Sequence, residues 1–239
     1  MEKIHIGHHI SQQFNEELED VRNRVLAMGG LVEQQLEGAI DALMNNDVEQ
    51  ADQVIKNDYK VNAMEVSIDE ECSRILARRQ PAASDLRLIM AVIKTITDLE
   101  RIGDQAERIG RMAKRLTEAH SETQAYAPVR HLGERVRTML HATLDSFARM
   151  DPEAAVAVAR EDISVDKDYD GLMRQLITHM MEDPRTITWV LDVMWSARAL
   201  ERIGDHARNI CEYVIYLVMG KDVRHTSIEH MEQEARGES

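Results

Sequence analysis

The stretch Leu99-Glu100-Arg101-Ile102-Gly103-Asp104 decides the fold, because the same six residues recur in order at positions 200–205. Six identical residues repeated 101 positions later indicate an internal duplication. A second correspondence supports this interpretation, since residues 46–51 align with residues 150–155 at an offset of 104. The chain of 239 residues therefore divides into two related units, and the second is shorter before its last helix.

Apolar residues recur with a period near 3.6 along most of the chain, which predicts helices. Only 4 prolines occur in the sequence, and 4% of the residues are aromatic, a composition that favours helix throughout. Capping and breaking signals at Asn46-Asp47, Pro81, Asp151-Pro152 and Asp183-Pro184 separate the helical segments. The six expected helices span about residues 12–45, 48–79, 85–118, 128–150, 152–182 and 184–219.

Long helices with short connections pack as antiparallel neighbours, so we expect an all-α fold of two tandem three-helix bundles related by internal duplication. The first bundle is expected within residues 1–120 and the second within residues 125–220, with a polar linker over 119–127. Gly220 suits the C-terminal cap of the last helix. Residues 221–239 have the composition of a polar, weakly ordered tail.

The charge balance excludes some classes of function. The chain carries 43 acidic and 29 basic residues, a formal charge of −14, which argues against nucleic-acid binding and against adhesion to an anionic bilayer. No run of apolar residues is long enough to span a membrane, and the first residues lack a secretory signal. Cys72 and Cys211 do not form a CxxC motif, so we expect reduced core thiols. A cytosolic protein is the resulting expectation.

Each copy of the hexapeptide places two carboxylates four residues apart, on one face of a helix. Like charges at this spacing repel each other, and a helix selected only for surface stability would carry a cation at the second position. The first pair continues an apolar stripe through Ile89, Ile93 and Ile96, so it does not belong to an ordinary solvated face. The second pair stands in the same relation to Val190 and Met194. Both pairs therefore predict a bound cation.

In each unit the preceding helix adds a matching polar pair, Asp58 with Asn62 in the first and Asp162 with Asp166 in the second. Two antiparallel helices then bring four oxygen-bearing side chains together, a donor set that suits Mg²⁺, Mn²⁺, Ca²⁺ or iron. Asn62 is neutral, so the first site is expected to be the weaker one. Gly103 and Gly204 lack a side chain and would admit a close helix or a ligand. The candidate metal ligands are Asp58, Asn62, Glu100 and Asp104 in the first unit, and Asp162, Asp166, Glu201 and Asp205 in the second.

Two other classes of protein compete with a metal-binding regulator. In a structural or dimerising helical protein, Arg101 and Arg202 would neutralise acids on a neighbouring helix and form an ion-pair network. A di-iron enzyme would need paired Glu-x-x-His motifs within the bundles, and the only such spacing joins Glu2 to His5. The sequence also lacks a Gly-rich phosphate loop and a GxSxG motif. We therefore expect no enzymatic activity, no catalytic residues and no organic cofactor.

Several motifs in order resemble the PhoU family of phosphate-signalling regulators. They are HISQQFNEEL at 9–18, MGGLVEQQL at 28–36, ARRQP at 77–81, SDLRL at 84–88 and both hexapeptides. The resemblance covers about residues 5–225 and implies tandem three-helix bundles with metal-binding acidic motifs. Carried onto this sequence, those motifs are the eight candidate ligands given above, with Asn62 departing from the fully acidic pattern.

The resemblance also implies a function and partners. Proteins of this family are cytoplasmic, commonly homodimeric, and peripheral to the inner membrane through other proteins. They act as negative regulators of the phosphate-starvation (Pho) response. In this role they couple the ATPase subunit of the high-affinity phosphate ABC transporter to a membrane sensor histidine kinase, and favour its inhibitory state when phosphate is plentiful.

Overall fold

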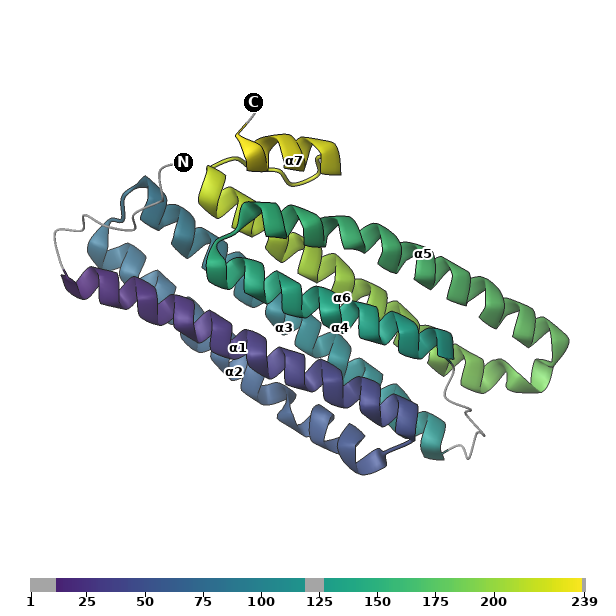
Figure 1. Ribbon diagram of the computed structural model, residues 1–239. Coiled ribbons are helices and arrows are strands. Elements are labelled where there is room, and N and C mark those ends of the chain that lie inside the picture. Colours follow the sequence, from purple (N-terminus) through teal and green to yellow (C-terminus); the bar gives the residue numbers. More distant parts are fainter. Residues whose placement is uncertain (1–11, 119–126, 238–239) are drawn as a thin grey trace.

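A computed structural model of the chain describes residues 12–118 and 127–237, and within these ranges the regular structure is entirely helical. The expected all-α architecture is confirmed (Figure 1). The expected linker over 119–127 lies almost wholly outside the described residues. The helices are α1 (Gln12–Asn45), α2 (Val48–Arg79), α3 (Ala83–Glu118), α4 (Ala127–Arg149), α5 (Pro152–Glu182), α6 (Ile187–Met219) and α7 (Ile228–Arg236), with a short 3₁₀ turn η1 (Pro184–Thr186) before α6.

The same turn joins the first two helices of each unit. Before α2, the side chain of Asp47 accepts a hydrogen bond of 2.9 Å from the backbone N–H of Gln50. Before α5, Asp151 accepts one of 3.0 Å from the N–H of Ala154. The residue preceding each cap has a positive φ, 54° at Asn46 and 51° at Met150. The duplication is therefore preserved in backbone conformation as well as in sequence.

The two bundles pack side by side through their third helices (Figure 1). Arg115 near the end of α3 forms an ion pair of 3.0 Å with Asp192 near the start of α6, which shows that the two helices run antiparallel. α1 and α4 add a second contact between the bundles. The buried apolar side chains form one continuous core that crosses this interface. Each hexapeptide lies in the middle of one of these two central helices.

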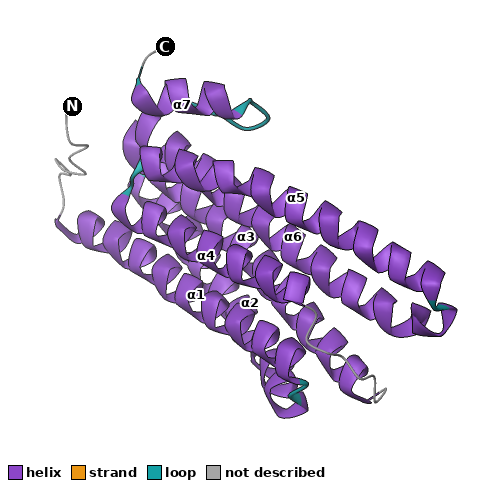
Figure 2. Cartoon of the chain, turned by 45° about the vertical axis from the view of Figure 1, so that its right-hand side comes forward, coloured by secondary structure: helices purple, strands orange, loops and turns teal. Residues whose placement is uncertain are grey.

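The expectation of a weakly ordered polar tail is wrong for residues 221–237. Ser227 is the N-cap of α7, and its hydroxyl accepts a hydrogen bond of 3.3 Å from the backbone N–H of His230. The helix packs against α5 (Figure 2). Its buried residues include Ile228 and Met231, and Val223 in the preceding loop is also fully buried. A helix of 9 residues holds too few apolar positions for a helical period to stand out in the sequence.

Two further expectations concern the state of the cysteines and the absence of a membrane-spanning helix. Cys72 and Cys211 are buried and unpaired, and burial raises the pKa of both thiols to about 12. Across the described part of the chain, no helix combines the length and the hydropathy needed to cross a bilayer.

Candidate metal centres

A glycine and a buried aspartate meet at the same place in both bundles. A Cβ atom on Gly103 would lie 3.4 Å from Asp58 Oδ1, and one on Gly204 would lie 3.4 Å from Asp162 Oδ1. The expectation that these glycines admit a close helix is therefore confirmed. We call Asp58, Asn62, Glu100 and Asp104 the first cluster, and Asp162, Asp166, Glu201 and Asp205 the second cluster.

The first cluster holds carboxylates that lack a cationic partner. Asp58 is 8% exposed; its Oδ2 accepts a hydrogen bond of 3.1 Å from the Asn62 amide, and its Oδ1 has no hydrogen-bond partner among the described residues. Burial and the charges of Glu107 and Asp104 raise the pKa of Asp58. Burial and the Asp104 charge likewise raise the pKa of Glu100. Nearby arginines act on these carboxylates only from a distance, and none of them forms an ion pair with the first cluster among the described residues.

The second cluster has the same carboxylates but contains cations. The guanidinium of Arg208 donates to Asp162 Oδ2 at 3.2 Å, and that of Arg198 donates to Glu201 Oε1 at 2.6 Å. Asp162 Oδ1 and Glu201 Oε2 have no hydrogen-bond partner in the described ranges. Burial, followed by the Asp205 charge, raises the pKa of Glu201 to about 7. Burial therefore opposes the ionisation of Glu201 despite the arginine beside it.

The donor atoms are suitable for a hard cation, although they do not surround a common point. Within residues 12–118 and 127–237, no three carboxylate, imidazole or thiolate side chains converge closely enough to hold one metal ion. A cation would stabilise the ionised form of these carboxylates, whose pKa values are raised, and would bind the buried oxygens that have no partner. The assignment of the eight residues as ligands therefore stays a prediction that the chemistry of the donor set favours.

The sequence pattern did not predict two residues that lie near the first cluster. Gln35 of α1 is 4% exposed, and neither its Oε1 nor its Nε2 has a hydrogen-bond partner among the described residues. Its Oε1 lies 3.2 Å from the position of a Cβ on Gly103, so it faces the same space as Asp58 Oδ1. Glu107 follows Asp104 by three residues on α3, and 22% of its side chain is exposed. The sequence signal that could have identified Gln35 is its place within the apolar stripe of α1.

The ion-pair alternative named the wrong arginines. Arg101 and Arg202 form no ion pair with an acidic residue in the part of the chain that the structure describes. Arg198 and Arg208 neutralise acids in the second cluster instead, and no sequence signal distinguished them from surface arginines. An ion-pair network therefore exists in the second bundle, made by other residues than those expected.

A buried polar group between the bundles was also missed. The carboxylate of Asp98 on α3 accepts hydrogen bonds from Asn209 at 3.2 Å and from the Tyr213 hydroxyl at 2.8 Å, and it lies 2.7 Å from Nδ1 of His206. Burial and the Asp98 charge raise the pKa of Tyr213. Asp98 precedes Glu100 by two residues and His206 follows Asp205 directly, so this group lies next to both clusters in sequence.

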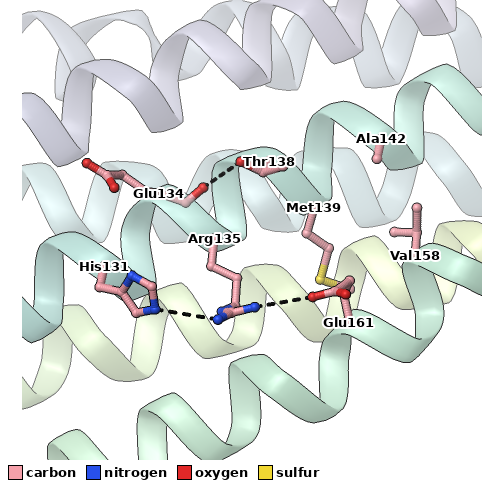
Figure 3. Close-up of a pocket in the computed structure, with 8 residues that line it drawn as sticks. All are labelled: His131, Glu134, Arg135, Thr138, Met139, Ala142, Val158 and Glu161. Carbon is pink, nitrogen blue, oxygen red and sulfur yellow. Dashed lines mark hydrogen bonds and ion pairs between the residues drawn. The ribbon is translucent and has the colours of Figure 1, made fainter.

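The groove between α4 and α5 is a different kind of site (Figure 3). It has a volume of about 340 Å³, with Met139, Ala142 and Val158 among the residues that line it. The guanidinium of Arg135 lies 2.7 Å from Asp168 and 3.2 Å from Glu161. Because both carboxylates already balance this arginine, it offers little free positive charge for an anion such as phosphate.

Comparison with known proteins identifies the family. A model of the PhoU domain matches residues 25–113 and 129–214, one match in each bundle. The chain is 54% identical over 239 residues to the phosphate-specific transport system accessory protein PhoU homolog of Pseudomonas aeruginosa, covering 99% of both chains. It is 50% identical to the accessory protein PhoU of Escherichia coli, covering 98% of this chain and 96% of that one.

Solved structures agree with the sequence comparison. The crystal structure of PhoU from Pseudomonas aeruginosa superposes with a TM-score of 0.85 at 55% identity, covering 87% of this chain and 100% of that chain. The phosphate transport system regulatory protein PhoU from Streptococcus pneumoniae gives a TM-score of 0.82 at 31% identity, covering 88% and 99%. The matched domains, the full-length relatives and the shared architecture together show that this chain belongs to the PhoU family.

Proposed function

We propose that this chain is a regulatory, non-catalytic accessory protein of the phosphate-specific transport system. The observation that carries the proposal is its identity of 50% to 55%, over 98% or more of its length, with relatives of that name. The nearly unbroken helical architecture and the absence of nucleotide-binding and hydrolase motifs from the sequence are in keeping with an adaptor.

In the finer form of the proposal, the chain is a homodimer that represses the phosphate-starvation response. It does so by linking the transporter's ATPase subunit to the sensor histidine kinase. A stripe of exposed apolar side chains on α6 supports a protein partner, since Ile187, Leu191 and Trp195 are 43%, 44% and 54% exposed. These residues are four positions apart, so they form one face, and such a face on a protein surface is typical of an interaction site.

Binding of Mg²⁺, Mn²⁺ or iron to the acidic clusters is the remaining part of the proposal. A cation there would neutralise carboxylates on two helices of one bundle and so hold those helices together. The buried oxygens without partners at Asp58, Asp162 and Glu201 support it.

The adaptor role can be tested in a bacterial strain that lacks its own protein of this family and carries a reporter of the phosphate-starvation response. We expect this chain to restore repression in high phosphate. Trp195→Glu should lose repression and should fail to retain the kinase or the ATPase subunit in a pull-down. Ile163→Glu is the matched control, because Ile163 is an isolated apolar residue on α5 that is 44% exposed. Full derepression with the unaltered chain would contradict the proposal, and light scattering would test the dimer.

A further inference from the structure

Five basic residues stand at intervals of seven along α3. They are Arg87, Lys94, Arg101, Arg108 and Arg115, and we call them the cationic row. Seven residues make almost two full turns of an α-helix, so these side chains follow one line on the helix surface, about 42 Å long. A line of this length that holds only cations contrasts with the formal charge of −14 of the whole chain.

The cationic row follows the seam along which α3 and α6 meet at the surface. The ammonium group of Lys94 lies 5.5 Å from the ring centroid of Tyr213 and 5.4 Å from that of Tyr216, both on α6. Three intervals of seven further along α3, Arg115 forms its ion pair of 3.0 Å with Asp192 of α6. Because the row contacts α6 at both of these places, it stays beside α6 over the whole distance between them.

The α6 side of the seam has a different chemistry. The counterparts of the cationic row, 101 residues later, are Thr188, Trp195, Arg202, Asn209 and Tyr216. A two-fold rotation that exchanges two antiparallel helices keeps corresponding residues on the same side of the pair, so this second row also follows the seam. Its most exposed large apolar residue is Trp195, at 54%. One side of the seam is therefore cationic, and the other is aromatic and polar with a single arginine.

The middle of the cationic row has no counter-ion. Arg101 and Arg108 are exposed, and neither forms an ion pair with an acid in the ranges that the structure describes. Asp104 lies between them in sequence, but burial and the Glu107 charge raise its pKa, and the charges of the two arginines offset this only in part. The positive charge of this segment is available to an external anion.

The register of the seam brings a third arginine to the same place. Lys94 lies beside Tyr216, so fourteen residues forward on α3 and fourteen back on α6 lead to Arg108 and Arg202 on opposite sides of the seam. Like charges that face each other raise the free energy, and an anionic group between them would lower it through charge-assisted hydrogen bonds. Trp195 follows Arg202 by one interval of seven, so an exposed indole borders this positively charged centre.

Exposed apolar side chains also lie along the outer edges of the seam. Met90 precedes Lys94 by four residues and is 37% exposed, and its counterpart Leu191 precedes Trp195 by four and is 44% exposed. The buried Asp98 follows Lys94 by four residues and points into the seam, so Met90 lies on the opposite, outward side of the row. A ligand that spans the seam would therefore meet cations in the middle and apolar surface at the edges.

We propose that the seam between α3 and α6 binds an acidic amphipathic helix of a protein partner. Its carboxylates would lie on the cationic row, and its apolar side chains would cover Trp195 and Leu191. A helix fits because its own side chains recur at intervals of seven, the spacing of the cations. A flexible polyanion would use the arginines but would gain nothing from the indole. This inference rests on the proposed adaptor function, and it names the chemistry of the segment that the adaptor recognises.

Photocross-linking and charge reversal test the proposal in the reporter strain described above. A photoreactive phenylalanine analogue at Leu191 should cross-link the full chain to an acidic helical segment of the kinase or of the ATPase subunit. Arg101→Glu/Arg108→Glu should retain that protein at least tenfold more weakly in a pull-down. The matched control Arg130→Glu/Arg174→Glu, at exposed arginines of α4 and α5, should change retention less than twofold. Replacing two glutamates of the cross-linked segment by arginine should restore retention by the first double variant.

The outcomes separate this inference from the proposed function. If the unaltered chain represses the reporter and Arg101→Glu/Arg108→Glu holds the same protein equally well, the inference is overturned while the function stands. A cross-link to a second copy of this chain, or to a basic segment, would overturn it as well. Failure of the unaltered chain to repress would overturn both. Thermal unfolding checks the fold, and if the double variant does not fold, Arg108→Gln decides the question through at least threefold weaker retention.

Discussion

The two bundles have the same backbone at their acidic clusters but different charges around them. The turn before the second helix, the glycine in the third helix and the aspartate that faces it recur with nearly the same geometry. The order of acid and base is reversed in one ion pair, Glu107–Arg111 in α3 against Arg208–Glu212 in α6. On a helix surface such a pair contributes only a few tenths of a kcal/mol, whereas in the second bundle the Glu212 side chain is buried, at 9% exposure. Duplication therefore preserved the geometry of a site while its chemistry diverged.

The largest effect is expected at the polar group that joins the bundles, where the symmetry is broken most completely. Asp98 has Ala199 as its counterpart, and its hydrogen-bond donors all come from α6. Asp98→Ala should lower the free energy of unfolding by about 3 kcal/mol, because it leaves the buried His206 and the partly buried Asn209 and Tyr213 without their partner. Tyr213→Phe, which removes one hydrogen bond, should cost about 1 kcal/mol. Urea denaturation measures both, and equal small effects would show that the bundles do not depend on this group.

A smaller effect should distinguish the two reversed arginines. Arg208→Met leaves the buried carboxylate of Asp162 without its cation, and we expect a loss of about 2 kcal/mol in chelator at neutral pH. That figure is below the usual cost of breaking a buried pair because the Arg208 side chain is 32% exposed. Arg111→Met should cost less than about 0.5 kcal/mol, since its ion pair with Glu107 is on the surface. Similar losses in the two variants, measured in the same urea titration, would contradict the difference between the clusters.

Stability should also depend on pH through Glu201. Its pKa of about 7 in the folded state lies above its ordinary value of 4.5, so between these values the folded chain holds a proton that the unfolded chain has released. The free energy of unfolding in chelator should therefore fall as the pH rises from about 5 to 8. Glu201→Gln should reduce this fall by about 1–2 kcal/mol. Glu100→Gln, at the more exposed counterpart, should reduce it less; a pH profile that neither substitution alters would refute the assignment.

The smallest change in stability is expected at the two glycines. A Cβ on Gly103 would lie 3.2 Å from Gln35 Oε1, and one on Gly204 would lie 3.2 Å from a methyl group of Val165. Alanine gains about 1 kcal/mol of helix propensity, which offsets these tight contacts, so both variants should unfold within about 1 kcal/mol of the unaltered chain. Both variants should weaken Mn²⁺ binding, because each added methyl group would lie 3.4 Å from an aspartate oxygen of a proposed metal cluster. Mn²⁺ affinities equal to that of the unaltered chain in both variants would count against those clusters.

Most of the fold could be predicted from the sequence, because duplication and a helical period act over tens of residues. The bounds of α1 and α2, and the caps at Asp47 and Asp151, follow from local signals alone. α7 was missed because a helix of 9 residues carries few apolar positions and is stabilised by packing on α5.

The candidate site was less predictable, because its chemistry depends on which side chains reach across from other helices. The eight acidic and amide residues lie in the sequence pattern itself. The guanidinium of Arg208 reaches α5 and the amide of Gln35 approaches α3, and neither contact follows from spacing along one helix. The group around Asp98 was beyond prediction for a related reason, since duplication predicts what two units share, and this contact exists only where they differ.

α7 has a consequence for how another protein orients itself on this molecule. Two bundles with the same helix course present two similar edges, and a partner that recognised only the shape of the helices would dock equally well in two opposite orientations. α7 covers part of α5, held there by the buried side chain of Met231 and by the ion pair between Glu232 and Arg160. The chain has no equivalent helix on α2 among its described residues. α7 therefore makes the second bundle distinguishable from the first for a docking partner.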